Sequence, residues 1–307
     1  MGYALSAEPQ PRIVEVGPRD GLQNESAVVS AEKKAAFVDA LAKTGLKEIE
    51  TGAFVSPQAV PQMADTAEVF AKIQRRPGVV YSALVPNQKG LERAMQAGAD
   101  KISVFTAASE TFNQKNIRAS ISESIERFRP VIRETKAARL PLRAYISTAF
   151  HCPYEGPVKP VAVLPIVKTL MGLGVDELSI GDTIGKASPR DVRSLLKPLL
   201  DIVPVEKLFL HFHDTYGMAI ANALTAWREF GVTGFDSSTG GLGGCPYAPG
   251  ASGNIATEDL VFALSAEGAD MGIDIEKLTA AARALVPSLG HPLDSRLSRV
   301  ASTGRHS

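Results

Sequence analysis

The sequence has little of what would indicate a secreted or membrane-bound protein. Its 307 residues include two cysteines, Cys152 and Cys245, which are too few for the disulfide framework of a secreted domain. No apolar run approaches the ~18 residues of a membrane span. The first residues lack the basic and apolar regions of a signal peptide. These absences predict a cytoplasmic protein that has no membrane partner.

Charge of neither sign is in excess. Lys and Arg together count 33, as do Asp and Glu, so the formal net charge is zero at pH 7. Nucleic-acid-binding proteins usually carry a basic excess, so nucleic acid is not expected as a partner. A local basic patch for a phosphate group is still compatible with this balance. Hydrophobic residues make up 45% of the chain, which is enough to bury a sizeable core.

The chain also lacks linkers and low-complexity segments, and short apolar runs alternate with longer helical stretches. This alternation is typical of βα units that form a parallel sheet. Eight strands with intervening helices over about 250 residues predict a single (β/α)8 TIM barrel. The strands are expected at residues 12–16, 48–53, 79–84, 101–105, 142–147, 177–182, 207–214 and 234–238.

The segments between these strands carry helix start and stop signals. Ser188 before Pro189 indicates an N-cap followed by a first-turn proline. Helices are expected at residues 31–44, 92–97, 121–138, 161–173 and 219–230, and Gly45, Gly98 and Gly231 are the stop signals of the first, second and last of them.

We predict one domain over residues 1–307. Its barrel should occupy about 11–258, and extra C-terminal helices should occupy about 259–307. The polar and basic end, residues 291–307, is expected to be partly disordered.

Chemically capable side chains collect at the expected C-terminal strand ends, where the active sites of such barrels lie. They follow or close the first, sixth, seventh and eighth strands, and Glu50 lies within the second. In chain order they are Arg19, Asp20, Glu50, Asp182, His211, His213, Asp214, Cys245 and Asn254.

His211 and His213 form the sharpest local feature. Residues two apart share a face of a strand, so both imidazoles should point into the barrel mouth. Two imidazoles on one face suit a divalent metal, and Asp20 and Asn254 are candidates to complete the site. The alternative is that each histidine is a hydrogen-bonded core residue.

Two loops add further candidates. The glycine-rich loop from Gly240 to Asn254 is suited to cover a ligand, and Cys245 within it can carry a proton. Alternatively, this loop is a flexible connection with an inert cysteine. It lacks the Gly-Lys-Ser/Thr ending of a P-loop, which argues against an NTPase. Arg19 and Asp20 lie in the second loop, after the first strand. The alternative to a functional role is that they are a pair of opposite charges on the solvated surface.

With these residues identified, the chain resembles the hydroxymethylglutaryl-CoA lyases, which belong to a wider group of metal-dependent lyases and Claisen-type synthases. The similarity covers about residues 12 to 300, in the correct order. It rests on VGPRDGLQNE (16–25), FVSP (54–57), VPQM (60–63), CPYEG (152–156), GDTIG (181–185), HFHDTYGMAIAN (211–222) and GLGGCPYAPGASGNIATEDLV (241–261).

The resemblance implies a role for each matching position. Arg19 would hold the substrate and neutralise the developing enolate, Gln23 would contact the substrate, and Cys245 would be the catalytic cysteine. Glu50 and Asp182 would be acidic groups of the active site. The implied ligands of Mg²⁺ or Mn²⁺ are Asp20, His211, His213 and Asn254.

The implied reaction is the metal-assisted cleavage of 3-hydroxy-3-methylglutaryl-CoA to acetyl-CoA and acetoacetate. The resemblance also implies a homodimer. Leucine degradation and ketone-body formation both use this reaction, and the sequence does not choose between them. The general base stays open among His211, Asp20 and Asp182.

Several positions near the barrel mouth depart from the family pattern. Family members often have Lys where this chain has Ser26, Ser where it has Ala53, and Lys-Trp where it has Gln58-Ala59. Thr148 and His151 of this chain stand where the family usually has a cysteine and a glycine, and Phe150 adds bulk beside them. The alternatives are therefore a lyase for a related branched 3-hydroxy-acyl-CoA, a Claisen-type synthase, and a non-catalytic acyl-CoA-binding barrel.

Overall fold

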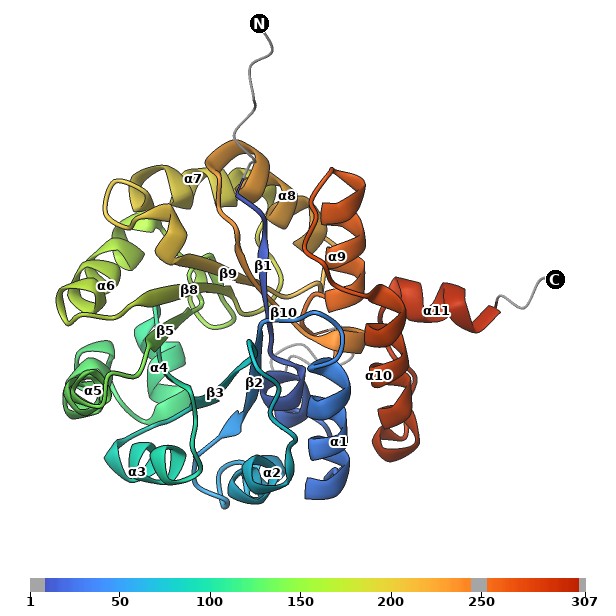
Figure 1. Ribbon diagram of the computed structural model, residues 1–307. Helices are drawn as coiled ribbons and strands as arrows, with labels where there is room; N and C mark the ends of the chain where they lie inside the picture. Colours follow the sequence, from blue (N-terminus) through green and yellow to red (C-terminus); the bar gives the residue numbers. More distant parts are fainter. Residues whose placement is uncertain (1–8, 244–252, 304–307) are drawn as a thin grey trace, which may run out of the picture.

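The computed structural model describes residues 9–243 and 253–303, and its centre is a closed barrel of eight parallel strands inside a ring of helices (Figure 1). The strands hydrogen-bond in the order β1-β10-β9-β8-β5-β4-β3-β2. This confirms the predicted TIM barrel. The strands are β1 (Arg12–Glu15), β2 (Glu48–Ala53), β3 (Val80–Leu84), β4 (Lys101–Ala107), β5 (Leu142–Ser147), β8 (Glu177–Asp182), β9 (Leu208–Phe212) and β10 (Gly234–Ser237).

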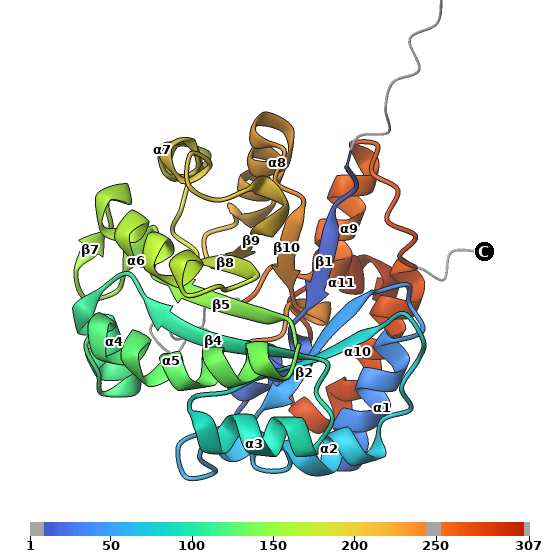
Figure 2. The same ribbon diagram turned by 60° about the vertical axis from the view of Figure 1, so that its left-hand side comes forward.

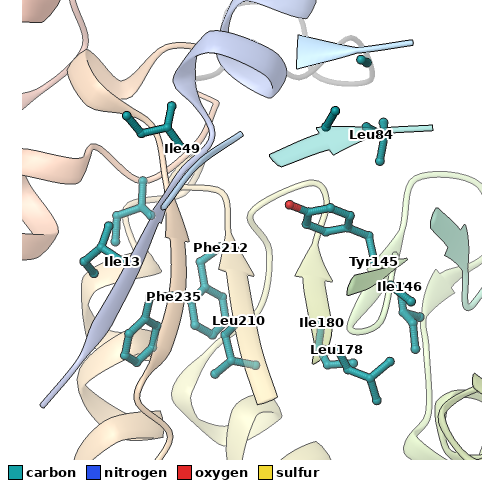
Figure 3. Packing of buried hydrophobic residues seen from close by; sticks show 14 of the residues in the cluster. Ile13, Ile49, Leu84, Tyr145, Ile146, Leu178, Ile180, Leu210, Phe212 and Phe235 are labelled. Atoms are coloured by element: carbon teal, nitrogen blue, oxygen red, sulfur yellow. The ribbon is translucent and has the colours of Figure 1, made fainter. Parts of the chain in front are cut away.

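The apolar strand residues divide between two environments because successive side chains point to opposite faces. On β9, Leu210 and Phe212 belong to the large core between strands and helices, whereas Phe209 packs with Val14 and Val16 in a separate small cluster. Figure 3 shows part of the outer core, with Phe212 and Phe235 on neighbouring strands. Phe212 therefore faces the helices, as predicted, and places His211 on the inner face.

All five expected helices form, the one at 219–230 with the predicted ends and the other four with shifted ends. The expected helix at 92–97 begins earlier, because Asn87 caps the new start by accepting a hydrogen bond from Gly90 N. Ser188 caps its helix as predicted, in a capping box with Asp191. The helices of the ring are α1 (Ala31–Leu41), α2 (Thr66–Lys72), α3 (Gln88–Gln96), α5 (Ile121–Ala137), α6 (Pro160–Gly172), α7 (Pro189–Leu199), α8 (Ala219–Phe230) and α9 (Thr257–Ala266).

Two elements in the loops after β4 and β5 were not expected. Helix α4 (Glu110–Ile117) precedes α5. A small antiparallel hairpin, β6 (His151–Cys152) with β7 (Gly156–Pro157), follows β5. Figure 2 shows α4 beside the ends of β4 and β5. These insertions extend the wall on one side of the barrel.

The C-terminal segment forms extra helices, as predicted. Helix α10 (Ile275–Leu289) packs against α1, and α11 (Arg296–Thr303) follows it at the edge of the molecule (Figure 1). The expected boundary at 258 falls inside α9, which packs against α8 as part of the ring. Within the described ranges, none of the helices combines the length and apolar character that a membrane crossing needs.

Candidate active site

A tight π-helical turn directly after β1, Gly17–Gly21, presents Arg19 and Asp20 at the C-terminal end of the barrel. The backbone N–H groups of Arg19 and Asp20 both donate to Val16 O, at 3.1 and 2.7 Å. Because the turn is hydrogen-bonded to the end of the strand, these two side chains are held by the barrel itself.

Asp20, His211 and His213 come together as a group whose ligand atoms all lie within 4.8 Å of one another. The two Nε2 atoms of His211 and His213 are 3.2 Å apart. Asp20 Oδ2 lies 3.7 Å from the first and 3.9 Å from the second. One carboxylate and two imidazoles that converge in this way form a site consistent with a divalent cation.

Asn254 completes the set from the segment after β10. Its Nδ2 donates to Asp20 Oδ2 at 2.9 Å and to Leu242 O at 3.1 Å. Its Oδ1 is buried and has no hydrogen-bond partner in the described part of the chain. Buried polar atoms are nearly always paired, so an amide oxygen beside Asp20 without a partner fits an oxygen-liganded cation.

Gly243 allows this close approach of the glycine-rich segment. Its φ is +106°, and a Cβ atom there would lie 2.7 Å from Asn254 Nδ2. Only glycine tolerates both conditions readily. Cys245, the predicted catalytic cysteine, lies outside the described residues.

Arg19 is held in place by two carboxylates. Its Nε donates to Glu50 Oε2 at 2.5 Å, and its Nη1 pairs with Asp20. Glu50 is fully buried in β2 and also accepts from Tyr145 Oη at 3.2 Å. Glu50 therefore orients Arg19 from beneath, and Asp20 links Arg19 to the histidine pair.

The pKa values of the cluster follow from burial and from these contacts. Burial raises the pKa of Asp20, but the charges of Arg19 and the imidazoles outweigh it and hold that pKa well below its usual range. Burial and the neighbouring His211 lower the pKa of His213 to about 4. An ionised carboxylate beside a neutral imidazole is the protonation state that metal ligands require.

A cavity of about 1000 Å³ opens above this group. Arg19, Asp20, Gln23, His211 and His213 all line it. The lining thus brings together five of the residues predicted for the site, and Tyr145 and Ser179 join them without having been predicted.

Asp182 closes β8, as expected, but it is not among the residues that line the cavity. Its two carboxylate oxygens accept hydrogen bonds from Lys186 N and Ala187 N, at 3.1 and 2.9 Å. Burial raises its pKa to about 7. In this arrangement Asp182 holds the loop before α7.

Sequence reasoning missed the buried polar residues below the cluster. Asp236 on β10 accepts hydrogen bonds from Arg143 Nη1 at 2.8 Å and from Ser179 Oγ at 2.6 Å. Its Oδ2 also lies 3.4 Å from His211 Nδ1. The signal that could have identified Asp236 is a carboxylate on the strand next to the one that carries the predicted histidine pair.

The positions that depart from the family pattern lie mostly away from the cavity. Ala53, Thr148 and Phe150 are buried, and Phe150 packs against Phe212 with ring centroids 6.1 Å apart. Of the replaced positions, only Gln58 and Ala59 line the cavity.

The geometry agrees with the relatives of this chain. The HMGL-like family model matches residues 10–285. The mitochondrial hydroxymethylglutaryl-CoA lyase of Bos taurus is 47% identical over 290 residues, which cover 94% of this chain and 89% of the bovine protein. The cytoplasmic 3-hydroxy-3-methylglutaryl-CoA lyase of Rattus norvegicus is 46% identical over 294 residues, covering 96% and 85%.

Solved structures show the same similarity. The HMG-CoA lyase of Bacillus subtilis superposes with a TM-score of 0.94 at 46% identity, covering 96% of this chain and 99% of that one. An HMG-CoA lyase of Acinetobacter baumannii, solved with coenzyme A and 3-methylmalate, has a TM-score of 0.91 at 37% identity, with 97% of each chain covered. From the family match, the identities and the shared fold together, this chain belongs to the HMGL-like family.

Proposed function

We propose that the protein is a carbon–carbon lyase that cleaves 3-hydroxy-3-methylglutaryl-CoA to acetyl-CoA and acetoacetate. The observation that carries this proposal is the contact between Arg19 and the Asp20–His211–His213 group at the floor of a cavity of about 1000 Å³. A cation site with an arginine beside it suits a reaction that passes through an oxyanion.

The proposed metal ligands are Asp20, His211, His213 and Asn254, and the proposed ion is Mg²⁺ or Mn²⁺. The partnerless Oδ1 of Asn254 supports its inclusion. A divalent cation held there would act as a Lewis acid and lower the pKa of a substrate hydroxyl.

Arg19 is the group that would stabilise the leaving enolate. Breaking the C2–C3 bond turns the C3 alkoxide into the ketone of acetoacetate and leaves the electron pair on the acetyl-CoA enolate. A guanidinium fixed by Glu50 is ready to donate to that oxygen without rearrangement. Glu50 does not line the cavity, so we propose that it acts by positioning Arg19.

Two proton transfers complete the reaction. The C3 hydroxyl must lose its proton, and of the three candidate bases only His211 and Asp20 line the cavity. The enolate must then gain a proton at C2, for which Cys245 is the proposed donor. We propose that Asp182 contributes by holding the loop before α7, because both of its oxygens are bonded to that loop.

The residues that line the cavity support hydroxymethylglutaryl-CoA as the substrate. Ala53, Thr148 and Phe150, where the sequence departs from the family pattern, do not line the cavity, which favours hydroxymethylglutaryl-CoA over another branched substrate. Gln23 lines the cavity and is the proposed contact for the substrate. The coenzyme A bound to the Acinetobacter relative supports an acyl-CoA as the substrate class.

The test is to incubate the purified protein with Mg²⁺ and hydroxymethylglutaryl-CoA and to quantify both products. Equal amounts of acetoacetate and acetyl-CoA are expected. The Cys245→Ala variant should lose most turnover and still bind Mn²⁺. A folded, metal-loaded protein that releases neither product would overturn the proposal. Turnover confined to another branched 3-hydroxy-acyl-CoA would show that this other compound is the substrate.

We also propose a cytoplasmic homodimer. The resemblance supports the dimer, and one relative is named as cytoplasmic, while another is named as mitochondrial. Light scattering on the purified protein tests the dimer, which a monomer mass would exclude. Fractionation of the source cells tests the compartment.

A further inference from the structure

Asp214 is a strand-end candidate to which the proposed reaction gives no role. It follows the proposed metal ligand His213 directly, and it is not among the described residues that line the cavity. Its side chain is nearly buried, with 9% exposed. Burying a carboxylate is unfavourable unless the charge is paired and hydrogen-bonded, so the partners of Asp214 indicate what it does.

The backbone of Asp214 joins the two segments that carry the ligands His213 and Asn254. Asp214 N donates to Gly253 O at 2.9 Å, and His213 pairs with Asn254 in an antiparallel bridge. These backbone contacts place an imidazole from the end of β9 beside an amide from the segment after β10. A shift of Asp214 would therefore move the two proposed ligands relative to each other.

The carboxylate of Asp214 is held from two sides. Ala219 N, at the start of α8, donates to its Oδ1 at 3.0 Å. Arg296 Nη1 donates to its Oδ2 at 2.8 Å, a contact across 82 positions in sequence. Arg296 is the first residue of α11. Asp214 is thus fixed between a helix of the barrel ring and the C-terminal helix.

The backbone around Arg296 is bound to the barrel, although the Arg296 side chain is itself 60% exposed. Asp259 on α9 accepts from Arg296 N at 2.8 Å. Ser295 N donates to Gly240 O, on the segment after β10, at 3.2 Å. A guanidinium that starts from a backbone fixed in this way can hold Asp214 at a defined place.

We propose that Arg296 is a positioning residue of the metal site, which acts through Asp214 on the ligands His213 and Asn254. The inference rests on the proposed function, because the metal site belongs to it. Charge-assisted hydrogen bonds between guanidinium and carboxylate fix geometry, and groups that orient metal ligands contribute to metal affinity. The Arg296–Asp214 pair is partly exposed and one residue removed from the ligands, so its effect should be modest.

The experiment measures Mn²⁺ affinity by electron paramagnetic resonance at low ionic strength, so it does not depend on turnover. Arg296→Gln should weaken Mn²⁺ binding by about threefold. Removing a positive charge would by itself favour a cation, so a weakening reports the loss of positioning. Arg296→Lys keeps the charge and a donor, and it should restore most of the affinity.

A double-mutant cycle tests whether Arg296 acts through Asp214. Asp214→Asn removes the charge of the partner and keeps an oxygen that can accept from Ala219 N. Adding Arg296→Gln to Asp214→Asn should weaken Mn²⁺ binding no further, because both changes remove the same interaction. Two independent contributions would instead multiply, and the double variant would bind about threefold more weakly than Asp214→Asn.

Arg283→Gln is the matched control. Arg283 on α10 donates to Ser298 O on α11 at 3.2 Å, so this change loosens the same helix and keeps the Arg296–Asp214 contact. It should leave Mn²⁺ affinity unreduced, and thermal melts of the metal-free proteins compare the loss of stability. Unreduced affinity in Arg296→Gln, a further loss in the double variant, or an equal loss in Arg283→Gln would overturn the inference. A protein that shows the expected affinities but releases no acetoacetate would contradict the proposed function alone.

Discussion

His211 Nδ1 lies 3.4 Å from Asp236 Oδ2, and the two residues are paired in the register of the neighbouring strands β9 and β10. His211 directs its other nitrogen, Nε2, at His213 and Asp20. A carboxylate behind a ligating histidine fixes the ring and its tautomer. Asp236 is itself fixed by Arg143 and Ser179, so the barrel floor orients the site above it.

Asp236→Asn should therefore weaken metal binding by about 10- to 100-fold. Free Mn²⁺ measured by electron paramagnetic resonance during a titration gives the affinity. Glu177→Gln is the matched control, because Glu177 contacts Arg143 without contacting His211. Equal Mn²⁺ affinities for Asp236→Asn and the wild-type protein would contradict the positioning role. A thermal melt of each variant separates loss of fold from loss of the site.

Arg19→Lys should lower turnover by about 100-fold or more, with little change in Mn²⁺ affinity. Lysine keeps the charge but cannot donate to Glu50 and to an enolate with the planar geometry of a guanidinium. Single-turnover kinetics together with the Mn²⁺ titration measure both quantities. Near-normal turnover would show that Arg19 serves binding alone and that the enolate is stabilised elsewhere.

The contact between His291 and Glu25 should make stability depend on pH. His291 Nε2 lies 2.6 Å from Glu25 Oε2, and this hydrogen bond raises the pKa of the imidazole. The stabilisation is present below the unfolded pKa of about 6.5 and is lost as the pH rises through the raised value. The side chain is partly exposed, so the effect should be small, about 0.5 kcal/mol.

Melting temperatures from pH 6 to pH 9 provide the comparison. The wild-type protein should lose stability over this range relative to His291→Gln, which cannot titrate at that position. Parallel curves for the two proteins would show that this pair contributes nothing.

Arg139→Gly should stabilise the protein by about 0.5–1 kcal/mol. Arg139 follows α5 with φ +57°, a conformation that glycine adopts without a steric cost. The neighbouring Ala138 is the control, because it has φ −76° and should be destabilised by the same change. Chemical denaturation of both variants measures the difference. A lower midpoint for Arg139→Gly would contradict the interpretation.

Much of the barrel could be predicted because its strands are short apolar runs followed by helical stretches. The shared orientation of His211 and His213 was predictable from strand alternation alone, because that prediction does not require knowing which strands lie beside theirs. Helix α4 and the β6–β7 hairpin were missed because they lie in loops, where local sequence competes with tertiary contacts. Arg143 and Asp236 were missed because a charged residue in a strand does not reveal whether it faces the barrel interior.

The partners of the predicted residues were harder to foresee than the residues themselves. Asn254 meets Asp20 only because the segment after β10 returns to the turn after β1, a contact across 234 positions in sequence. Asp182 was predicted for the site from its place at a strand end, yet its hydrogen bonds go to its own loop. Position at a strand end thus identified candidates, and the loop contacts decided which of them reach the cavity.

The most direct test of the account is the metal dependence of product release from hydroxymethylglutaryl-CoA. Protein stripped with a chelator should release no acetoacetate, and added Mg²⁺ or Mn²⁺ should restore release in proportion to occupied sites. Asp20→Asn should bind Mn²⁺ weakly and stay inactive at metal concentrations that saturate the wild-type protein. Release that continues at full rate in the stripped protein would contradict a metal-assisted cleavage at this site.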